Sequence, residues 1–316
     1  MSDSLGDRLT GRDLAAVLAV VVIWGMNFVV MKAGLRDFSP FQLGAARYVL
    51  AVLPAVLIVR PPSIHWKWVV LYGLLQGVGQ FGLLFLALKV GMTAALASVL
   101  LQTQVFFTAL FGFLLLHERA SKPLQWGMGL AALGLACFAM NYLAPGAAAG
   151  STTTSTTAWG LALTLCASAM WAGSNIVARQ VQQHHQNYSA VAFVVWSSSV
   201  AIVPFAALSL AFDDPSIRWQ WLDARLGSWL AVAYLGWVAT VLGYSLWTGL
   251  LKRHPANRVA PFSLGVPIVG LAAGVGLLGE VITPWQWAGI ALVVAALVCV
   301  MLGGRIGARK TVISGA

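Results

Sequence analysis

The feature that most constrains this chain is a succession of long apolar runs. A helix needs about 20 apolar residues to cross a hydrocarbon core of roughly 30 Å. Ten runs of about that length occur in the 316 residues. Because they are continuously apolar rather than alternating, they predict helices and not barrel strands. We therefore expect an all-α integral membrane protein with ten spans, near 14–31, 40–59, 69–88, 94–116, 124–143, 158–178, 189–212, 227–251, 259–279 and 284–304.

Composition excludes a soluble globular enzyme. The chain is 59% hydrophobic and only 9% charged, whereas a soluble domain has about 25% charged residues. A net charge of +10 could suit nucleic acid, but the basic residues fall in short clusters between the apolar runs, which indicates membrane topology. Cys137, Cys166 and Cys299 all lie within apolar runs, so no disulfide or zinc framework is predicted. The expected surroundings are a lipid bilayer, with no nucleic-acid partner.

The distribution of Lys and Arg predicts the orientation in the membrane. Of 19 such residues, 13 lie on the side that holds both termini, five lie on the other side, and Arg47 lies within a span. Because the basic side faces the cytoplasm, segments 1–13 and 305–316 are predicted to be cytoplasmic. The first run follows Arg8 and Arg12 but is too long for a signal peptide and lacks a cleavage site, so we interpret it as a retained span.

An internal repeat divides the chain at the small, uncharged segment 144–157, which is predicted to be an external linker. The segments at the ends of the two halves match with one gap: Leu116, Glu118, Ser121, Pro123, Gln125 and Trp126 correspond to Leu278, Glu280, Thr283, Pro284, Gln286 and Trp287. Each half, 14–143 and 158–304, holds five spans. Because five is odd, the second half must enter the membrane from the opposite side, which places Glu118 inside and Glu280 outside. Such inverted repeats are typical of transporters, whose substrate site lies where the halves meet.

Arg47 is the one formal charge that the sequence places at membrane depth. An ionisable residue there is a functional hypothesis by default, and a guanidinium can receive a carboxylate through two parallel hydrogen bonds. The alternative is a structural role, in which Arg47 snorkels outward or pairs with backbone carbonyls and Asp37.

Amides and indoles inside the spans form a second group of candidates. They need partners, either on a neighbouring helix or on a ligand in a polar cavity. For any single Asn or Gln helix packing is the better interpretation, but for the set we favour a cavity. The predicted substrate-binding residues are Trp24, Asn27, Arg47, Gln76, Gln80, Gln102, Trp171 and Asn175. The aromatic stripe in the eighth span, by contrast, is more typical of packing or a membrane-interface belt; it comprises Tyr234, Trp237, Tyr244 and Trp247.

Three prolines interrupt spans that otherwise look helical, namely Pro204, Pro261 and Pro267. Each removes an amide donor and frees a carbonyl, so each is a candidate hinge, a tolerated kink being the alternative. The spans contain no Asp or Glu, and the histidines lie in loops or at span ends. The sequence therefore offers no constellation for a membrane hydrolase, no metal site, no cofactor site and no buried carboxylate for a proton relay.

Several segments resemble a known family. They are the run from Val22 to Lys32 around Trp24 and Asn27, the stretches from Ala94 to Thr108 and from Arg258 to Gly270, and the paired Glu-x-x-x-x-Pro-x-Gln segments. Over about residues 14 to 302 the chain is similar to the EamA family of the drug/metabolite transporter superfamily, and within it to exporters of O-acetylserine and cysteine.

The resemblance implies export of a small amino-acid-like metabolite across a bacterial inner membrane by alternating access, without enzymatic activity. A homodimer is possible. Alternatives are an exporter of another metabolite or a drug and, from a different class, a membrane enzyme or scaffold.

Overall fold

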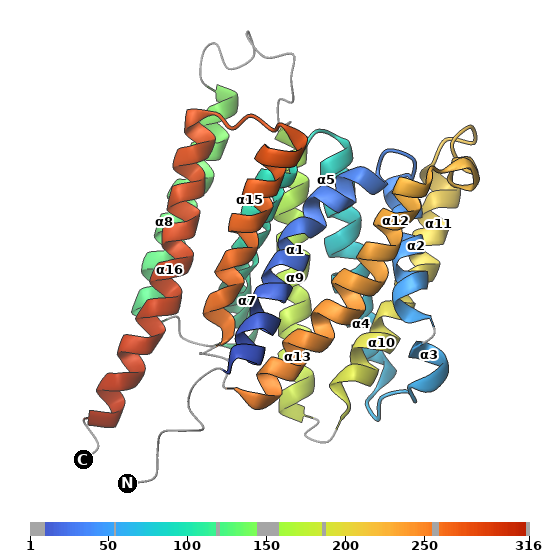
Figure 1. Cartoon of the computed structure of the whole chain (residues 1–316). Coiled ribbons are helices and arrows are strands. Elements are labelled where there is room, and N and C mark those ends of the chain that lie inside the picture. Colours follow the sequence, from blue (N-terminus) through green and yellow to red (C-terminus); the bar gives the residue numbers. More distant parts are fainter. Residues whose placement is uncertain are drawn as a thin grey trace.

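The structure, a computed structural model, describes residues 10–53, 55–117, 121–143, 158–184, 188–254 and 259–313, and within them every regular element is helical (Figure 1). The expectations for the linker 144–157, for Glu118 and for the first nine and last three residues lie outside these described residues. The first half contains α1 (Gly11–Gly34), α2 (Pro40–Val52), α3 (Ala55–Ile58), α4 (Trp66–Tyr72), η1 (Gly73–Gly82), α5 (Leu83–Lys89), α6 (Ala94–Leu100), η2 (Leu101–Thr103), α7 (Gln104–Leu116) and α8 (Lys122–Leu143).

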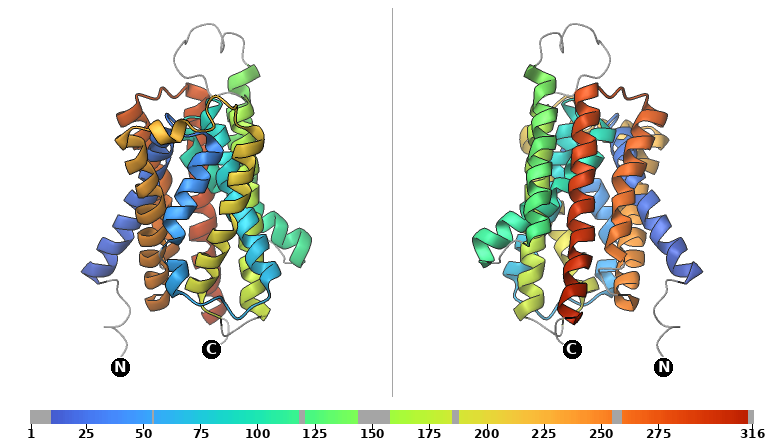
Figure 2. Two further views of the ribbon diagram at one scale, coloured as in Figure 1. Left: turned by 90° about the vertical axis from the view of Figure 1, so that its right-hand side faces the viewer. Right: turned by 90° about the vertical axis from the view of Figure 1, so that its left-hand side faces the viewer.

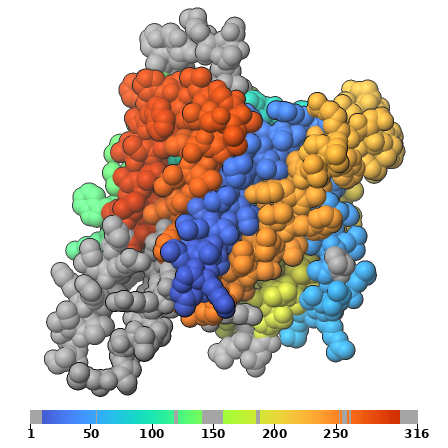
Figure 3. All heavy atoms as spheres, in the orientation of Figure 1, coloured from blue at the N-terminus to red at the C-terminus, as the bar shows by residue number. Residues whose placement is uncertain are grey.

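The second half follows the same plan. It contains α9 (Ala158–His184), α10 (Ala190–Val200), α11 (Ile202–Phe212), η3 (Gln220–Asp223), α12 (Leu226–Ala233), η4 (Tyr234–Leu242), α13 (Gly243–Arg253), η5 (Ala260–Leu264), α15 (Gly265–Leu278) and α16 (Pro284–Ile313). The start of α1 and the end of α16 lie at the same end of the bundle in all three views (Figures 1 and 2). On the face seen in Figure 3, α1 lies between α15 and α13 and contacts both.

Eight helical segments of the described chain are long and apolar enough to cross a membrane. They run over Gly11–Gly34, Trp66–Lys89, Ala94–Leu116, Lys122–Met140, Ala158–His184, Ala190–Phe212, Leu226–Leu251 and Pro284–Met301, and Phe262–Leu278 is a shorter apolar helix. The predicted second span differs, because its helix is interrupted after Val52. Leu53 there has the extended backbone angles φ −84° and ψ 132°, which a residue preceding a proline, here Pro54, favours over the helical region.

The two halves share their departures from the α-helix. The third helical segment of each half contains a π-helix, η1 between α4 and α5 in the first and η4 between α12 and α13 in the second. The fourth helical segment of each half contains a short 3₁₀ helix, η2 directly before α7 in the first and η5 directly before α15 in the second. A π-helix is rare and tends to occur at functional sites. Its presence at matching places in both halves agrees with the repeat that the sequence indicates.

Glycines allow the halves to approach at equivalent places. A Cβ on Gly73 would overlap the carbonyl oxygen of Ser197, and one on Gly236 would lie 3.0 Å from that of Arg47. Ser197 and Arg47 are each eight residues after a serine that caps its helix, Ser189 and Ser39. Only glycine permits such close backbone contact without a shift. The π-helix of each half therefore packs directly against the second helical segment of the other half, η1 against α10 and η4 against α2.

Polar side chains join segments of the two halves at both ends of the bundle. Near the start of α1, Asp13 pairs with Arg253 at the end of α13, and His254 Nε2 lies 2.9 Å from the Asp13 carboxylate. Near the end of α1, Lys32 pairs with Glu280 at 3.0 Å. We call these ends the Asp13 end and the Lys32 end. Asp13, which the sequence places outside the first span, lies in the first turn of α1 and is 6% exposed, and its carboxylate accepts from Thr10 and pairs with Arg253. Glu280, which the sequence places in an external loop, is only 3% exposed because its carboxylate packs against the backbone at the start of α6.

The three candidate hinge prolines all lie near breaks in helical geometry. Pro204 is the third residue of α11, directly after the break at Ala201 that ends α10. Pro261 lies in the 3₁₀ segment η5, and Pro267 follows in the first turn of α15. Whether these breaks move during function stays a prediction.

Candidate functional site

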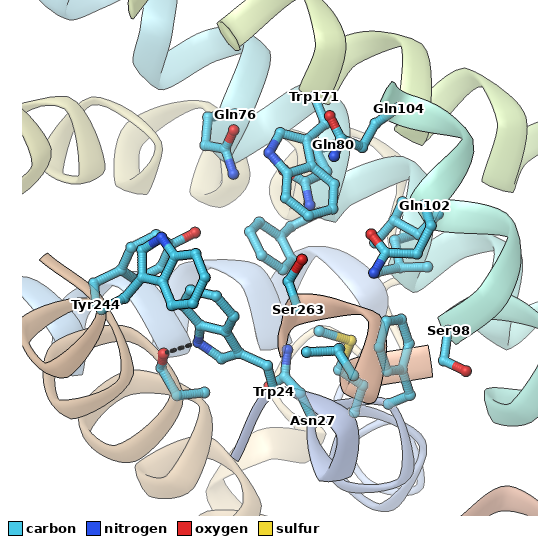
Figure 4. Close-up of a pocket in the computed structure, with 18 of the residues that line it drawn as sticks. Trp24, Asn27, Gln76, Gln80, Ser98, Gln102, Gln104, Trp171, Tyr244 and Ser263 are labelled. Atoms are coloured by element: carbon cyan, nitrogen blue, oxygen red, sulfur yellow. Dashed lines mark hydrogen bonds between the residues drawn. The ribbon is translucent and has the colours of Figure 1, made fainter. Parts of the chain in front are cut away.

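A cavity of about 320 Å³ lies between the two halves (Figure 4). Both repeats supply its walls, and all eight residues selected from the sequence line it, which are Trp24, Asn27, Arg47, Gln76, Gln80, Gln102, Trp171 and Asn175. Figure 4 shows Trp24 and Asn27 of α1 on one side, with Gln76 of η1 and Trp171 of α9 opposite. The structure thus brings the predicted set together, while substrate binding by these residues stays a prediction.

Arg47 lies deep in the wall of this cavity and is 2% exposed. Its guanidinium carbon lies 3.7 Å from the centroid of the Phe81 ring, and its Nη2 donates to Thr240 Oγ1 at 3.2 Å. Its Nε and Nη1 have no hydrogen-bond partner among the described residues, and no carboxylate there forms an ion pair with it. Arg47 is therefore buried rather than directed outward, and Asp37 pairs with Arg225 instead of Arg47.

The π-helix η4 holds Trp24 in place. The Trp24 Nε1–H group donates to the carbonyl oxygen of Ala239 at 3.0 Å, and the ring lies 5.3 Å from Tyr244 and 5.6 Å from Trp247, centroid to centroid. Gly243 leaves room for this indole, since a Cβ there would lie 2.6 Å from Nε1. Because its only donor is engaged, Trp24 offers the cavity an aromatic face rather than a hydrogen bond.

The amide side chains divide into engaged and unengaged groups. Asn175 Nδ2 donates to Gln104 Oε1 at 2.8 Å, and Gln76 Oε1 accepts from the Ser174 hydroxyl, so these bonds join η1 and α7 to α9. By contrast, Asn27 Oδ1 and Gln80 Oε1 are buried and have no hydrogen-bond partner within the described part of the chain. A buried unsatisfied acceptor costs about 1–3 kcal/mol, so these two amides and Arg47 are the groups that a bound ligand or water would stabilise most.

Sequence reasoning missed several residues of the wall. Tyr244 and Trp247, interpreted as packing or a membrane belt, face the cavity instead, because η4 changes the side-chain register of this helix by adding a residue to the turn. Phe81, the residue after Gln80, was not predicted as a lining residue because its side chain is apolar. Further lining residues are Phe28, Met31, Tyr72, Leu84, Ser98, Leu101, Gln104, Ala239, Ser263 and Val266. Of these, Gln104 could have been found, since it lies two residues after Gln102.

Burial increases along the cavity toward the Lys32 end. On α1, Trp24 is partly exposed whereas Met31, two turns nearer that end, is 0% exposed. The segment from α6 to α7 runs in the opposite direction to α1 and shows the same gradient. Ser98 in α6 is 1% exposed, whereas Gln104 at the start of α7 is partly exposed. The cavity is therefore reached from the Asp13 end and closed at the Lys32 end.

The described residues offer no group of three His, Cys, Asp or Glu side chains placed to hold a metal ion. The cavity combines one guanidinium, amides, hydroxyls and aromatic rings, which suits binding of a small polar molecule. Helices long enough to cross a bilayer and a cavity shared by two related halves define a membrane protein of the transporter class.

Comparison with known proteins assigns the family. The EamA-like transporter family matches residues 13–140 and 158–302, nearly all of both halves. The chain belongs to the EamA-like transporter family, which confirms the resemblance drawn from the sequence. It is 38% identical over 304 residues to a probable amino-acid metabolite efflux pump of Salmonella typhimurium strain LT2, covering 96% of this chain and 98% of that protein.

Other relatives agree with this assignment. A probable amino-acid metabolite efflux pump of Escherichia coli strain K12 is 36% identical and covers 94% of this chain and 97% of its own. The uncharacterized inner membrane transporter YedA of the same strain is 26% identical, covering 95% and 94%. One solved crystal structure, 14% identical, covers 93% of this chain and 99% of its own with a TM-score of 0.55, which supports the fold alone.

Proposed function

We propose that this protein exports small amino-acid-like metabolites, of the cysteine and O-acetylserine class, across a bacterial inner membrane by alternating access. One observation carries the proposal: a cavity lined by both halves brings together Arg47 and the amides and indoles selected from the sequence. The relatives described as probable amino-acid metabolite efflux pumps support the substrate class. In the proposed cycle the halves rock about the cavity, and the breaks near Pro204, Pro261 and Pro267 absorb the movement.

The chemistry of the wall suggests how such a substrate would bind. The two unpartnered nitrogens of Arg47 would receive the carboxylate. Asn27 Oδ1 and Gln80 Oε1, also unpartnered, would accept from the ammonium group. The indole faces of Trp24 and Trp171 would add attraction for that cation, which can reach about 2 kcal/mol when it is desolvated.

The proposed topology has ten spans in two inverted repeats, with both termini in the cytoplasm. The eight long helices, the shorter Phe262–Leu278 and the interrupted segment containing α2 support that number. Reporter fusions after α5, α8 and α16 test the arrangement, because the model of ten spans requires the first two outside and the third inside. Opposite locations for the two termini would contradict it.

Reconstitution tests the function itself. The purified protein is placed in sealed proteoliposomes loaded with labelled cysteine, O-acetylserine, a sugar and a lipophilic drug, with and without a pH gradient. We expect release of the amino acids above the level of empty liposomes. Release of the sugar or drug alone would favour another exporter, and release of nothing would favour a membrane enzyme or scaffold.

A further inference from the structure

A buried polar contact outside the cavity joins Glu280 to two helices of the first half, α1 and α6. One carboxylate oxygen accepts from Lys32 Nζ at 3.0 Å and from the backbone N–H of Ala94 at 2.7 Å. The other accepts from the backbone N–H of Ala95 at 2.8 Å. The side chain of Glu280 is 1% exposed and that of Lys32 is 23% exposed. Charge-assisted hydrogen bonds of this kind are stronger than neutral ones, especially away from water.

Two glycines close to Glu280 in the sequence make room for its carboxylate. The helix α15 ends at Gly279, whose left-handed φ of 64° turns the chain so that Glu280 points back toward α6. Gly274 provides the space, since a Cβ there would lie 2.5 Å from Glu280 Oε2 and 2.7 Å from Ala95 N. Two glycines and the glutamate therefore act as one unit that fastens α15 to α1 and α6.

This unit lies at the closed end of the cavity. Lys32 follows Met31, and Ala95 lies one turn before Ser98; both Met31 and Ser98 line the buried end of the cavity. On the other side of the contact, Lys32 and Glu280 line a second hollow of about 270 Å³ at the Lys32 end, together with Leu35, Arg36, Leu88, Lys89 and Leu278. Glu280 thus stands between the cavity and an outer vestibule.

We propose that Glu280, with Lys32 and the first amides of α6, is the gate that closes the substrate cavity at the Lys32 end. Opening would require α15 to part from α1 and α6, which breaks all three contacts together. The structure then corresponds to the state open at the Asp13 end. That this is one state of an alternating-access cycle rests on the proposed function, whereas the gating contact itself can be tested without any substrate.

The test measures how fast a cavity cysteine reacts with a membrane-impermeant maleimide from each side. Cys137, Cys166 and Cys299 are first replaced by alanine, and Ser98→Cys is introduced as the reporter near the gate. Inside-out and right-side-out vesicles present opposite ends of the protein to the reagent. With Glu280 intact, we expect slow labelling from the Lys32 end. Glu280→Ala should accelerate labelling from that end by about tenfold or more, because the equilibrium shifts toward the open gate.

Two further variants test the contact without removing the carboxylate. Gly274→Ala should accelerate labelling in the same direction, because the added methyl displaces Glu280 Oε2. Lys32→Met should have a smaller effect than Glu280→Ala, since the amides of Ala94 and Ala95 keep their acceptor. The matched control is Asp37→Asn, which breaks the Asp37–Arg225 ion pair at the same end and should leave the labelling rate unchanged.

The outcomes separate the gate from the proposed function. Unchanged labelling from the Lys32 end in Glu280→Ala and in Gly274→Ala, with normal amounts of protein in the membrane, would overturn the gate. If Glu280→Ala fails to reach the membrane, Gly274→Ala and Lys32→Met decide alone. A protein that releases no metabolite from liposomes yet shows the accelerated labelling would keep the gate and lose the exporter assignment.

Discussion

The guanidinium of Arg47 is stacked on the ring of Phe81, with 3.7 Å between its carbon and the ring centroid. Arg47 comes from α2 and Phe81 from η1, so the contact joins two helices of the first half. It fixes the plane of a cation that has only one hydrogen bond to the described protein, to Thr240 of the second half. A cation held in this way keeps two nitrogens available for a ligand, at a cost in desolvation.

We predict that Arg47→Ala abolishes export while the protein accumulates normally. Since no carboxylate is left unpaired by the change, Arg47→Met should be neutral or stabilise the fold by about 1 kcal/mol. Arg47→Lys should give intermediate export because an ammonium lacks the planar fork. Transport is measured in proteoliposomes, with Arg225→Ala as the control for an exposed arginine. Unchanged export by Arg47→Ala would reject its role.

A second prediction concerns Trp24. Trp24→Phe loses the hydrogen bond to Ala239 but keeps the aromatic contacts, so it should lower the free energy of unfolding by about 1 kcal/mol. Trp24→Ala also loses the ring and should cost about 3–5 kcal/mol. Denaturation in detergent measures both, and the exposed Trp237→Phe serves as control. Equal stabilities of parent and Trp24→Ala would show that the indole does not hold η4.

The glycine contacts between the halves give a third prediction. Gly236→Ala would press on the backbone of Arg47, and Gly73→Ala would press harder on that of Ser197. Both should destabilise, Gly236→Ala by about 1–3 kcal/mol and Gly73→Ala by more. Gly249→Ala has open space and should stabilise its helix by up to about 1 kcal/mol. The three midpoints of thermal unfolding, compared in one detergent, check this order, and a stable Gly73→Ala would contradict it.

The ion pair of Asp37 and Arg225 leads to a pH prediction. The Arg225 guanidinium and the Ser228 hydroxyl hold the pKa of Asp37 well below its usual range. A carboxyl with a lowered pKa stabilises the fold above its unfolded value of about 3.9 and loses that contribution as the pH falls. The difference in unfolding free energy between parent and Asp37→Asn should therefore be constant from about pH 7 to pH 5 and shrink below about pH 4. A difference as large at pH 2 as at pH 7 would contradict this assignment.

Much of this architecture follows from local features of the sequence. The helical spans, the two related halves and the family could be predicted from local properties of the sequence. These are the length of each apolar run, the polar residues between runs and the motifs that occur in both halves. Trp24, Asn27 and Arg47 could be chosen for the same reason, since few polar groups occur at membrane depth. Even the break after Val52 has a local cause in Pro54.

What the residues of the wall do was decided only in three dimensions. Asn175 is engaged by Gln104, 71 residues away, whereas Asn27 Oδ1 has no partner among the residues that the structure describes. Nothing in their own segments distinguishes the two. Glu280 looks like a loop residue until α6 and Lys32, more than 180 residues earlier, bring donors to it. Hydrogen bonds and burial depend on which distant segments meet, so the sequence determined the helices and their polar inventory. Tertiary packing decided which of those groups are satisfied by protein and which have no partner among the described residues.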